Sequence, residues 1–145
     1  KSLGATATVS LKSSADERHR QIYDLCGANG PDVVVEAAGV LQAFPEGVSV
    51  AGKHGRYIIL GLWGAIGEQP ISPRDLTLKN LTIAGASFPK PKHYHAALHL
   101  AARLEGEVPL ADLVTHRFGI AGATAALAAT KAGEVIKAII DPEKD

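Results

Sequence analysis

The chain has 145 residues, of which 46% are hydrophobic and 21% charged, as expected for a globular chain with about one domain's core. Lysine plus arginine and aspartate plus glutamate each total 15, so no net positive charge is available to hold nucleic acid. The single cysteine, Cys26, excludes an internal disulfide and a cysteine-rich zinc site. The uncharged run Tyr57–Gly67 is far shorter than a membrane helix, and the N-terminus lacks a signal-peptide pattern, so we predict a soluble cytoplasmic protein.

The first part of the chain predicts a strand followed by a helix. The segment Ala5–Leu11 is rich in threonine and valine, which favour strands. Ser14 and Glu17 match a capping box, in which the serine side chain accepts from a backbone amide of the first helical turn. We therefore expect a helix that begins after Ser14 and ends at Gly27.

The segment Pro31–Gly39 predicts a buried strand that leads into a glycine turn. Three consecutive valines, residues 33–35, cannot alternate between core and solvent, which is typical of a parallel strand covered on both faces. Small residues follow at positions 37–39, where a ligand lying across the strand ends would need close approach to the backbone. We therefore predict that this strand end is a cofactor-binding edge.

The same pattern recurs further along the chain. Apolar residues at spacings of three and four predict a helix over Leu41–Ala51, and Tyr57–Leu60 is a second strand-favouring run that ends in a glycine. Residues 64–80 are interrupted by proline and glycine, which predicts irregular structure, and Leu81–Ala86 predicts a further strand. Strands that alternate with helices in this way indicate an α/β protein with a parallel sheet.

From Ser87 onward the pattern changes. Two prolines mark a boundary before a helix with an apolar stripe, formed by Tyr94, Ala97, Leu98, Ala101 and Leu104. The remaining predicted elements are the strand Val114–Phe118, the alanine-rich helix Gly122–Ala132 and the strand Val135–Ile140.

Two motifs resemble ligand sites but lack residues that such sites require. Residues 47–53 spell the phosphate-loop pattern G-x-x-x-x-G-K, but His54 stands where serine or threonine would hold magnesium, and the predicted helix comes before Gly52 and Lys53 instead of after them. His95 and His99 have the i, i+4 spacing of two metal ligands on one helix face. Because they lie opposite the apolar stripe and lack the glutamate of a zinc-protease helix, a solvated face is favoured and we predict no metal ligand.

Lys137 is the basic residue with the strongest case for a ligand contact. In the predicted last strand it shares a face with Val135 and Ile139, and a lysine between buried aliphatic side chains needs an anionic partner or a route to water. Two interpretations stay open at this point: ligand binding, or an edge-strand lysine that discourages aggregation.

Several segments, in this order, resemble the zinc-type alcohol dehydrogenases of the medium-chain dehydrogenase/reductase family. They read D-V-V-V-E-A-A-G, G-R-Y-I-I-L-G-L-W-G, L-T-L-K-N-L-T-I-A-G-A, and a closing run from L-V-T-H-R-F to G-E-V-I-K-A-I-I. The resemblance implies that residues 1–86 form the second half of an NAD(P)-binding Rossmann domain, a doubly wound parallel sheet. Residues 87–145 would form an α+β segment in which the chain returns to the catalytic domain.

The resemblance also implies an activity for the longer protein. Hydride would pass between NAD or NADP and a small-molecule alcohol or carbonyl substrate, with zinc bound only through residues upstream of this chain. The chain contains no G-x-G-x-x-G pyrophosphate loop and does not begin with methionine, so we expect part of an enzyme, without catalytic residues or metal ligands and inactive alone.

Positions that match the family imply the contact residues. The expected cofactor-binding residues are Ala38, Gly39, Leu60, Gly61, Leu62, Thr82, Ala84 and Lys137, of which the last would meet the pyrophosphate. The expected substrate-pocket residues are Leu62, Trp63 and Ile83. The family's last Rossmann strand commonly pairs across a dimer axis, which implies a homo-oligomer, a dimer or tetramer, formed through Leu81–Ala86.

The strand order of this fold, 3-2-1-4-5-6, has a consequence for the first predicted strand. It places two strands that this chain lacks between Ala5–Leu11 and the strand at Val33–Glu36. We therefore predict that Ala5–Leu11 is unpaired, displaced or paired with another copy, while the other three strands stay adjacent. The alternative functions are a zinc-independent quinone or enoyl reductase of the same superfamily and a non-catalytic interaction module.

Overall fold

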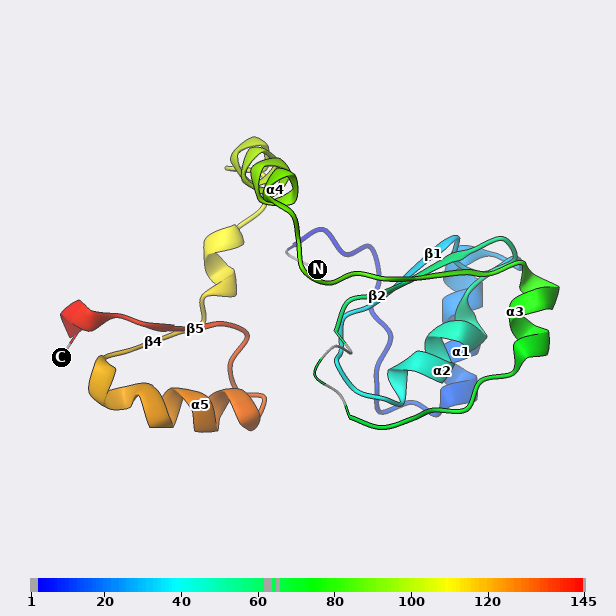
Figure 1. Cartoon of the computed structure of the whole chain (residues 1–145), viewed down its shortest axis with the longest axis horizontal. Coiled ribbons are helices and arrows are strands. Elements are labelled where there is room, and N and C mark those ends of the chain that lie inside the picture. Colours follow the sequence, from blue (N-terminus) through cyan, green and yellow to red (C-terminus); the bar gives the residue numbers. More distant parts are fainter. Residues whose placement is uncertain (1–2, 62–63, 65, 145) are drawn as a thin grey trace. The chain divides into compact units, whose positions relative to one another are not determined.

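A computed structural model describes residues 3–61, 64 and 66–144 (Figure 1). The chain forms two compact units, one of which is Ala7–His93, while the other contains Tyr94 onward together with the residues before Ala7. The predicted division into residues 1–86 and 87–145 by parent domain stays a prediction.

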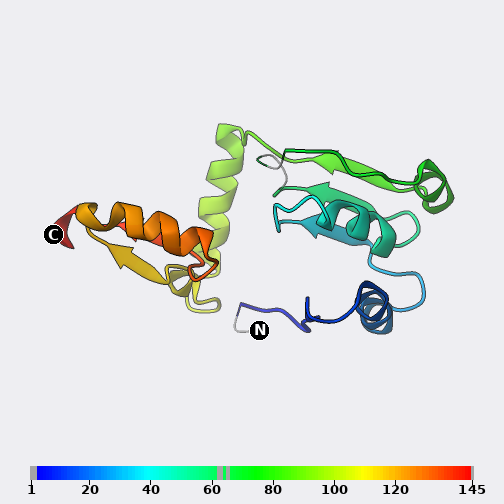
Figure 2. The same cartoon turned by 90° about the horizontal axis from the view of Figure 1, so that it is seen from below.

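The first unit is a three-stranded parallel sheet with helices on one face. The strands are β1 (Val33–Glu36), β2 (Arg56–Ile59) and β3 (Thr82–Gly85), in the order β1-β2-β3. The helices are α1 (Ala15–Cys26), α2 (Ala43–Val50) and α3 (Pro73–Lys79). The strands lie side by side in Figure 2, and Figure 1 shows the helices together on one side of them.

Local sequence signals account for the ends of α1. The Ser14 hydroxyl accepts a hydrogen bond from the Glu17 amide at 3.2 Å, as the capping box predicts. At the other end Gly27 has a φ of 86°, a left-handed conformation that favours glycine. The predicted first helix is therefore confirmed at both ends.

Tyr57 is the centre of the core between α2 and the sheet. Its side chain is fully buried, and its hydroxyl donates to the Ala43 carbonyl at 3.1 Å. Gly47 of α2 lies directly over the ring, because a Cβ added there would stand only 2.3 Å from it. The glycine thus lets the helix approach the sheet closely enough to bury the tyrosine.

The second unit contains the remaining helices and a small parallel sheet. Helix α4 (Pro91–Arg103) leads into it, and β4 (His116–Phe118) pairs in parallel with β5 (Ala138–Ile140), the two being connected through the helix α5 (Ala123–Lys131). The unit also contains the short 3-10 helices η2 (Leu110–Leu113), η3 (Ile120–Gly122) and η4 (Pro142–Lys144).

Three predictions about secondary structure and burial are wrong. Ala5–Leu11 forms no strand, whereas the prediction that it stays unpaired while β1, β2 and β3 remain adjacent is confirmed. The segment predicted to be irregular contains α3, which begins at Pro73 and is followed by Asn80, a residue in the left-handed conformation. Val33 and Val35 are 58% and 55% exposed, because the helices cover only one face of the sheet in this chain.

Candidate functional site: the carboxyl ends of the parallel strands

One carboxylate joins the turns that follow β1 and β2. Glu36 is the last residue of β1 and is only 4% exposed. Its Oε1 atom accepts from the Gly39 amide at 2.7 Å, and its Oε2 atom accepts from the Gly61 amide at 3.0 Å. The backbone carbonyl of Glu36 also accepts from the Leu60 and Gly61 amides, at 2.9 and 3.0 Å. The two strand ends are therefore held together by a single residue.

Gly39 and Gly61 leave no room for side chains where these turns meet. Gly39 has a φ of 70°, and a Cβ added to Gly61 would lie 2.6 Å from the Gly39 nitrogen. A contact this short is not formed by real Cβ atoms, so position 61 requires glycine, and the positive φ of Gly39 favours glycine at position 39. The result is a bare stretch of backbone at the carboxyl edge of a parallel sheet, which is where open α/β sheets bind ligands.

The negative charge of Glu36 acts on a second buried group. Burial, and after it the nearby charge of Glu36, raises the pKa of the Tyr57 hydroxyl to about 12. The hydroxyl therefore stays protonated at neutral pH and can donate to the Ala43 carbonyl. The Glu36 carboxylate and the Tyr57 hydroxyl are thus two buried polar groups, each with its own hydrogen-bond partners.

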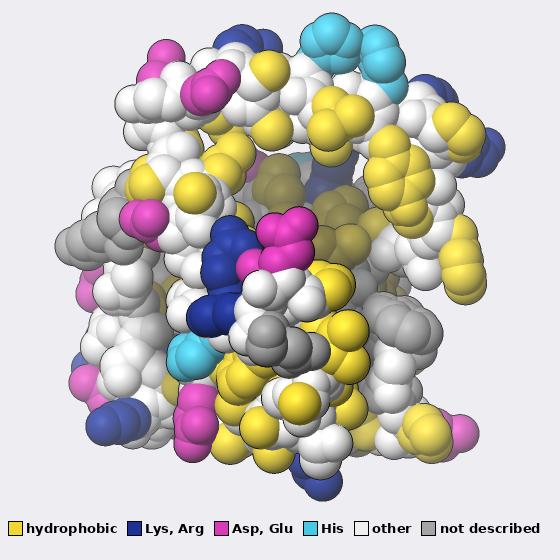
Figure 3. Space-filling view, turned by 90° about the vertical axis from the view of Figure 1, so that its left-hand side faces the viewer, with side chains coloured by type: hydrophobic (Ala, Val, Ile, Leu, Met, Phe, Trp, Pro, Cys, Tyr) yellow, Lys and Arg dark blue, Asp and Glu magenta, His cyan; other side chains and the backbone are white. Residues whose placement is uncertain are grey.

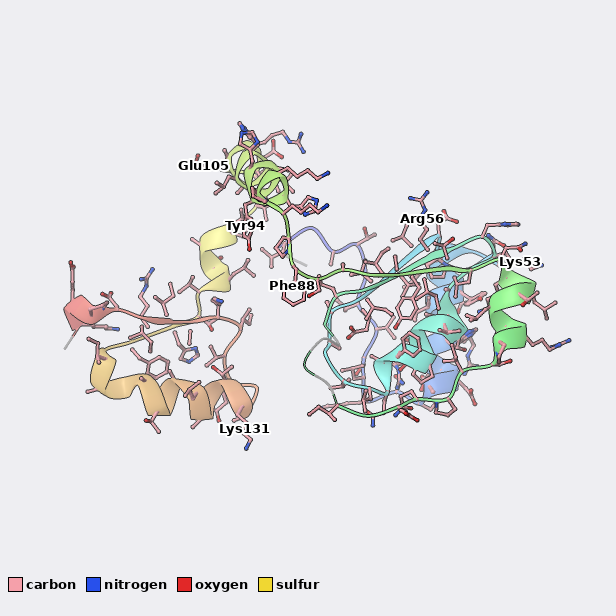
Figure 4. The ribbon with its side chains drawn as sticks, in the orientation of Figure 1. Lys53, Arg56, Phe88, Tyr94, Glu105 and Lys131 are labelled. Atoms are coloured by element: carbon pink, nitrogen blue, oxygen red, sulfur yellow. The ribbon has the colours of Figure 1, made fainter. Side chains whose placement is uncertain are left out.

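A hollow of about 390 Å³ lies at the neighbouring strand ends. It is lined by Leu60, Gly85, Ala86, Ser87, Pro89 and His93. Beside it, Phe88 has a φ of 51° and an 89% exposed side chain (Figure 4). A volume of this size suits a small planar group such as one ring of a cofactor.

The structure brings together some of the predicted cofactor residues and separates others. Gly39 and Gly61 meet at the strand ends, and Leu60, which is 50% exposed, borders the hollow. Ala84 lies on the uncovered face of the sheet, opposite Ile58 in the register, and Ala38 is exposed in the turn after β1.

Other predicted site residues are less close or fall outside what is described. Thr82 pairs with Arg56 at the amino ends of the strands, so it does not join the glycines at the carboxyl ends. Ile83 is half-buried and pairs with Tyr57 on the face that the helices cover. Leu62 and Trp63 lie outside the described residues.

Comparison with known proteins identifies the family of the chain that carries this strand edge. The family described as zinc-binding dehydrogenase matches residues 1–103, which is most of the chain. The chain belongs to the zinc-binding dehydrogenase family. The sequence resemblance to zinc-type alcohol dehydrogenases is thereby confirmed.

Three similar proteins illustrate the match to this dehydrogenase family. The 5-exo-hydroxycamphor dehydrogenase of Pseudomonas putida is 61% identical over 142 residues, which are 97% of this chain and 39% of that protein. A sorbitol dehydrogenase of Halalkalibacterium halodurans is 31% identical over 121 residues, 83% of this chain and 34% of that protein. A crystal structure of an alcohol dehydrogenase from Thermotoga maritima matches with a TM-score of 0.86 and 28% identity, covering 96% of this chain and 38% of that one. The α/β fold with parallel sheets is therefore confirmed, and the chain spans about two fifths of the length of such dehydrogenases.

The structure contradicts the burial predicted for Lys137. The residue precedes β5 instead of lying within it, its side chain is exposed, and its carbonyl accepts from the Thr115 and His116 amides at 3.1 and 3.3 Å. Lys137 borders an apolar hollow of about 450 Å³ formed by α5 and β5 in the second unit. The contact with pyrophosphate that the dehydrogenase resemblance implies stays a prediction, but burial between aliphatic side chains no longer supports it.

Sequence reasoning missed Glu36 as the residue that organises the strand ends. Its signal was an acidic residue placed between an apolar run and two small residues, since a carboxylate there must be buried or the strand must end. It also missed Lys79, whose ammonium donates to the Val48, Ser49 and Ala51 carbonyls at 3.0, 2.6 and 2.9 Å. These are the carbonyls at the C-terminus of α2, where a positive charge is favourable.

Two searches of the described residues concern clusters of metal ligands and helices that could cross a membrane. No three histidine, cysteine, aspartate or glutamate side chains gather within residues 3–61, 64 and 66–144 in a way that could hold a metal ion. Within the same residues, no helix combines the length and apolar character that crossing a bilayer requires.

Proposed function

We propose that this chain supplies the nicotinamide-side half of the dinucleotide site in an NAD(P)-dependent zinc-type alcohol dehydrogenase. The observation that carries this proposal is the bridge from the buried Glu36 carboxylate to the Gly39 and Gly61 amides. The bridge fixes two side-chain-free turns at the carboxyl edge of a parallel sheet, and such edges accept dinucleotides. A dinucleotide therefore suits the residues present.

The residues at this edge would have different roles according to their chemistry. The backbone at Gly39 would run under the dinucleotide, while Leu60 and the hollow beside it would hold the nicotinamide ring and keep water away. The bound cofactor would accept or donate the hydride. Lys137 would meet the pyrophosphate, and Leu62 and Trp63 would form a wall of the substrate pocket, to which Ile83, on the face that the helices cover, would contribute only from behind.

Nuclear magnetic resonance of the 145-residue chain tests the cofactor proposal directly. Titration with NADH should shift the backbone amide signals of Gly39 and Gly61, and nicotinamide mononucleotide should shift those of Leu60 and Ala86. Gly27, which follows α1, and Gly133, which follows α5, do not line the proposed site and serve as internal controls. Shifts spread equally over the control glycines, or no shift at millimolar cofactor, would contradict the proposal.

The resemblance also implies that the chain alone is inactive. A chimera tests this expectation and tests whether the chain can supply its part of an active enzyme. In the chimera, residues of this chain replace the matching segment of the Pseudomonas putida 5-exo-hydroxycamphor dehydrogenase, to which it is 61% identical over 142 residues. We expect NAD(P)-dependent alcohol oxidation by the chimera and none by the isolated chain. Turnover by the isolated chain, or an inactive chimera that folds, would refute this part.

The same relative supports a substrate class, a secondary alcohol on a bulky bicyclic skeleton. The chimera should therefore oxidise 5-exo-hydroxycamphor with a kcat/KM close to that of the parent enzyme, and should leave open-chain polyols such as sorbitol unchanged. Preference for sorbitol would overturn the substrate class without affecting the cofactor proposal. Reduction of quinones without alcohol oxidation would instead favour a zinc-independent reductase.

An edge strand supports a second role, association of two copies. β3 is the terminal strand of the three-stranded sheet, so the backbone groups on its outer side have no neighbouring strand within the described chain. We propose that β3 pairs with its counterpart across a two-fold axis, forming a homo-oligomer. Light scattering that shows a monomer at high protein concentration, together with measurable NADH binding, would exclude this role.

A further inference from the structure

We propose that His95 and His99 form a surface site that chelates one divalent transition-metal ion, such as Ni²⁺, Zn²⁺ or Cu²⁺. Both residues lie on α4 with i, i+4 spacing, and both are exposed. Histidine side chains gather at the surface over α4 in the space-filling view (Figure 3). Their exposure agrees with the solvated face that the sequence predicts, but the side chains also converge on each other.

The distance between the two imidazoles matches bidentate coordination. Their Nε2 atoms are 3.1 Å apart, and the ring centroids are 4.3 Å apart with the planes inclined at 63°. Two imidazole nitrogens bound at about 2.1 Å to one ion, with an angle of roughly 95° between them, stand about 3.1 Å apart. The spacing of the two nitrogens is therefore already that of a chelated pair, and an ion would replace the proton that they share once the two rings turn so that both lone pairs point at it.

The surroundings of the histidine pair determine which ion should bind and with what affinity. Imidazole nitrogen suits Cu²⁺, Ni²⁺ and Zn²⁺ better than Mg²⁺ or Ca²⁺, which prefer oxygen ligands. Helix α4 carries no aspartate or glutamate, and Lys92 and Arg103 flank the pair along the helix. The two imidazoles alone must therefore supply the protein ligands, water fills the other positions, and the affinity should follow the order Cu²⁺ above Ni²⁺ and Zn²⁺.

Calorimetric titration of the 145-residue chain with NiCl₂ and ZnCl₂ tests the site. We use Cys26→Ser as the background, so that the one thiol is not a competing ligand. One ion should bind per chain, and either His95→Gln or His99→Gln should weaken binding by about tenfold or more, because a single imidazole remains. Glutamine is a good helix former, so neither exposed substitution should disturb α4.

His93→Gln is the matched control, because His93 lies on the same helix and is also exposed, but its spacing of two and six residues from His95 and His99 puts it on another side of the helix. Its Nδ1 atom accepts instead from the Lys90 amide at 3.1 Å. The control should bind the ions like the background protein, and added Ni²⁺ should raise the thermal midpoint of helical circular dichroism only when both His95 and His99 are present. Equal affinity in all variants, an equal loss in His93→Gln, or no binding at millimolar ion would overturn the proposal.

Discussion

Replacing Glu36 by glutamine tests the bridge between the strand ends. Glutamine keeps the shape of the side chain, but it has one carbonyl oxygen where the carboxylate has two acceptors. It can therefore accept from only one of the Gly39 and Gly61 amides, which now donate at 2.7 and 3.0 Å, and its own NH₂ group faces the other donor. A hydrogen bond to a charged group contributes about 1.5–3 kcal/mol. The Gly61 amide also donates to the Glu36 carbonyl at 3.0 Å, so it keeps an acceptor when the glutamine side chain accepts from Gly39. We therefore expect the free energy of unfolding to fall by about 1.5–3 kcal/mol.

Two measurements follow the loss of this bridge. Urea unfolding monitored by circular dichroism gives the change in stability, and hydrogen exchange monitored by nuclear magnetic resonance follows the Gly39 and Gly61 amides individually. Glu105→Gln is the control, because it makes the same chemical change at an exposed position (Figure 4). Its effect on unfolding should be small, since surface charges contribute little.

The pattern of the results separates a positioning role from general destabilisation. In the chimera with the hydroxycamphor dehydrogenase, Glu36→Gln should raise the KM for the dinucleotide more than it lowers kcat, because the turns carrying Gly39 and Gly61 lose their alignment. Unchanged protection of both amides, with a stability equal to that of Glu105→Gln, would refute the bridge. A lower stability with an unchanged KM would leave the bridge structural and refute its role in cofactor positioning.

Three further changes test other contacts of the first unit. Gly61→Ala should lower the free energy of unfolding, measured in urea, by about 1–3 kcal/mol and weaken NADH binding, because the added Cβ would overlap the neighbouring turn. Gly85→Ala is the control and should be tolerated, because the space around its Cβ is open. The free energy of unfolding should fall by at most about 3 kcal/mol as pH rises from about 10 through 12. The cause is the raised pKa of Tyr57, which keeps this hydroxyl protonated in the folded state at pH values where it ionises in the unfolded state. Tyr57→Phe should remove this dependence. Lys79→Met should lower the thermal midpoint of unfolding, because it removes three hydrogen bonds to the end of α2, and Lys53→Met, at an exposed turn, should leave that midpoint nearly unchanged.

The order of helices and strands could be predicted where local signals and burial agree. The hydrophobic run of β1, the Ser14 cap of α1 and the glycine after β2 each act within a few residues, so a short window contains the information. The helix α3 was missed because prolines and glycines surround it, although Pro73 at its first position and Asn80 at its end are themselves helix boundary signals.

Predictions that depended on contacts with residues distant in sequence were right only where the chain provides those contacts. Ala5–Leu11 has the composition of a strand, yet β-propensity needs a neighbouring strand, and the described chain provides none for it. Val33 and Val35 were predicted to be buried because their hydrophobicity reflects a sheet covered on both faces, whereas the helices of this chain cover one. Lys137 was misplaced for a different reason: β5 begins only at Ala138, so the alternation assumed for the lysine does not apply.

The candidate site was only partly predictable, because its central interaction joins residues that are distant in sequence. Glycines after each strand indicated where a ligand would approach, and that inference needed only the sequence near Gly39 and Gly61. That both amides share one carboxylate depends on the register of β1 with β2, in which Glu36 pairs with Ile59. A one-residue shift in this register would move the Gly61 turn away from Glu36, and no local pattern encodes that register.

The direction of these hydrogen bonds restricts how a dinucleotide would be held at the strand ends. Because the Gly39 and Gly61 amides donate inward to Glu36, they are not free to donate to a phosphate. A carboxylate just beneath the turns would also repel a pyrophosphate placed directly over it. The turns should therefore hold the uncharged parts of the cofactor by close contact, and its negative charge must be met by groups outside these turns. Glu36→Gln should consequently weaken the binding of NADH and of nicotinamide riboside, which carries no phosphate, by similar factors, and a loss confined to NADH would contradict this account of the turns.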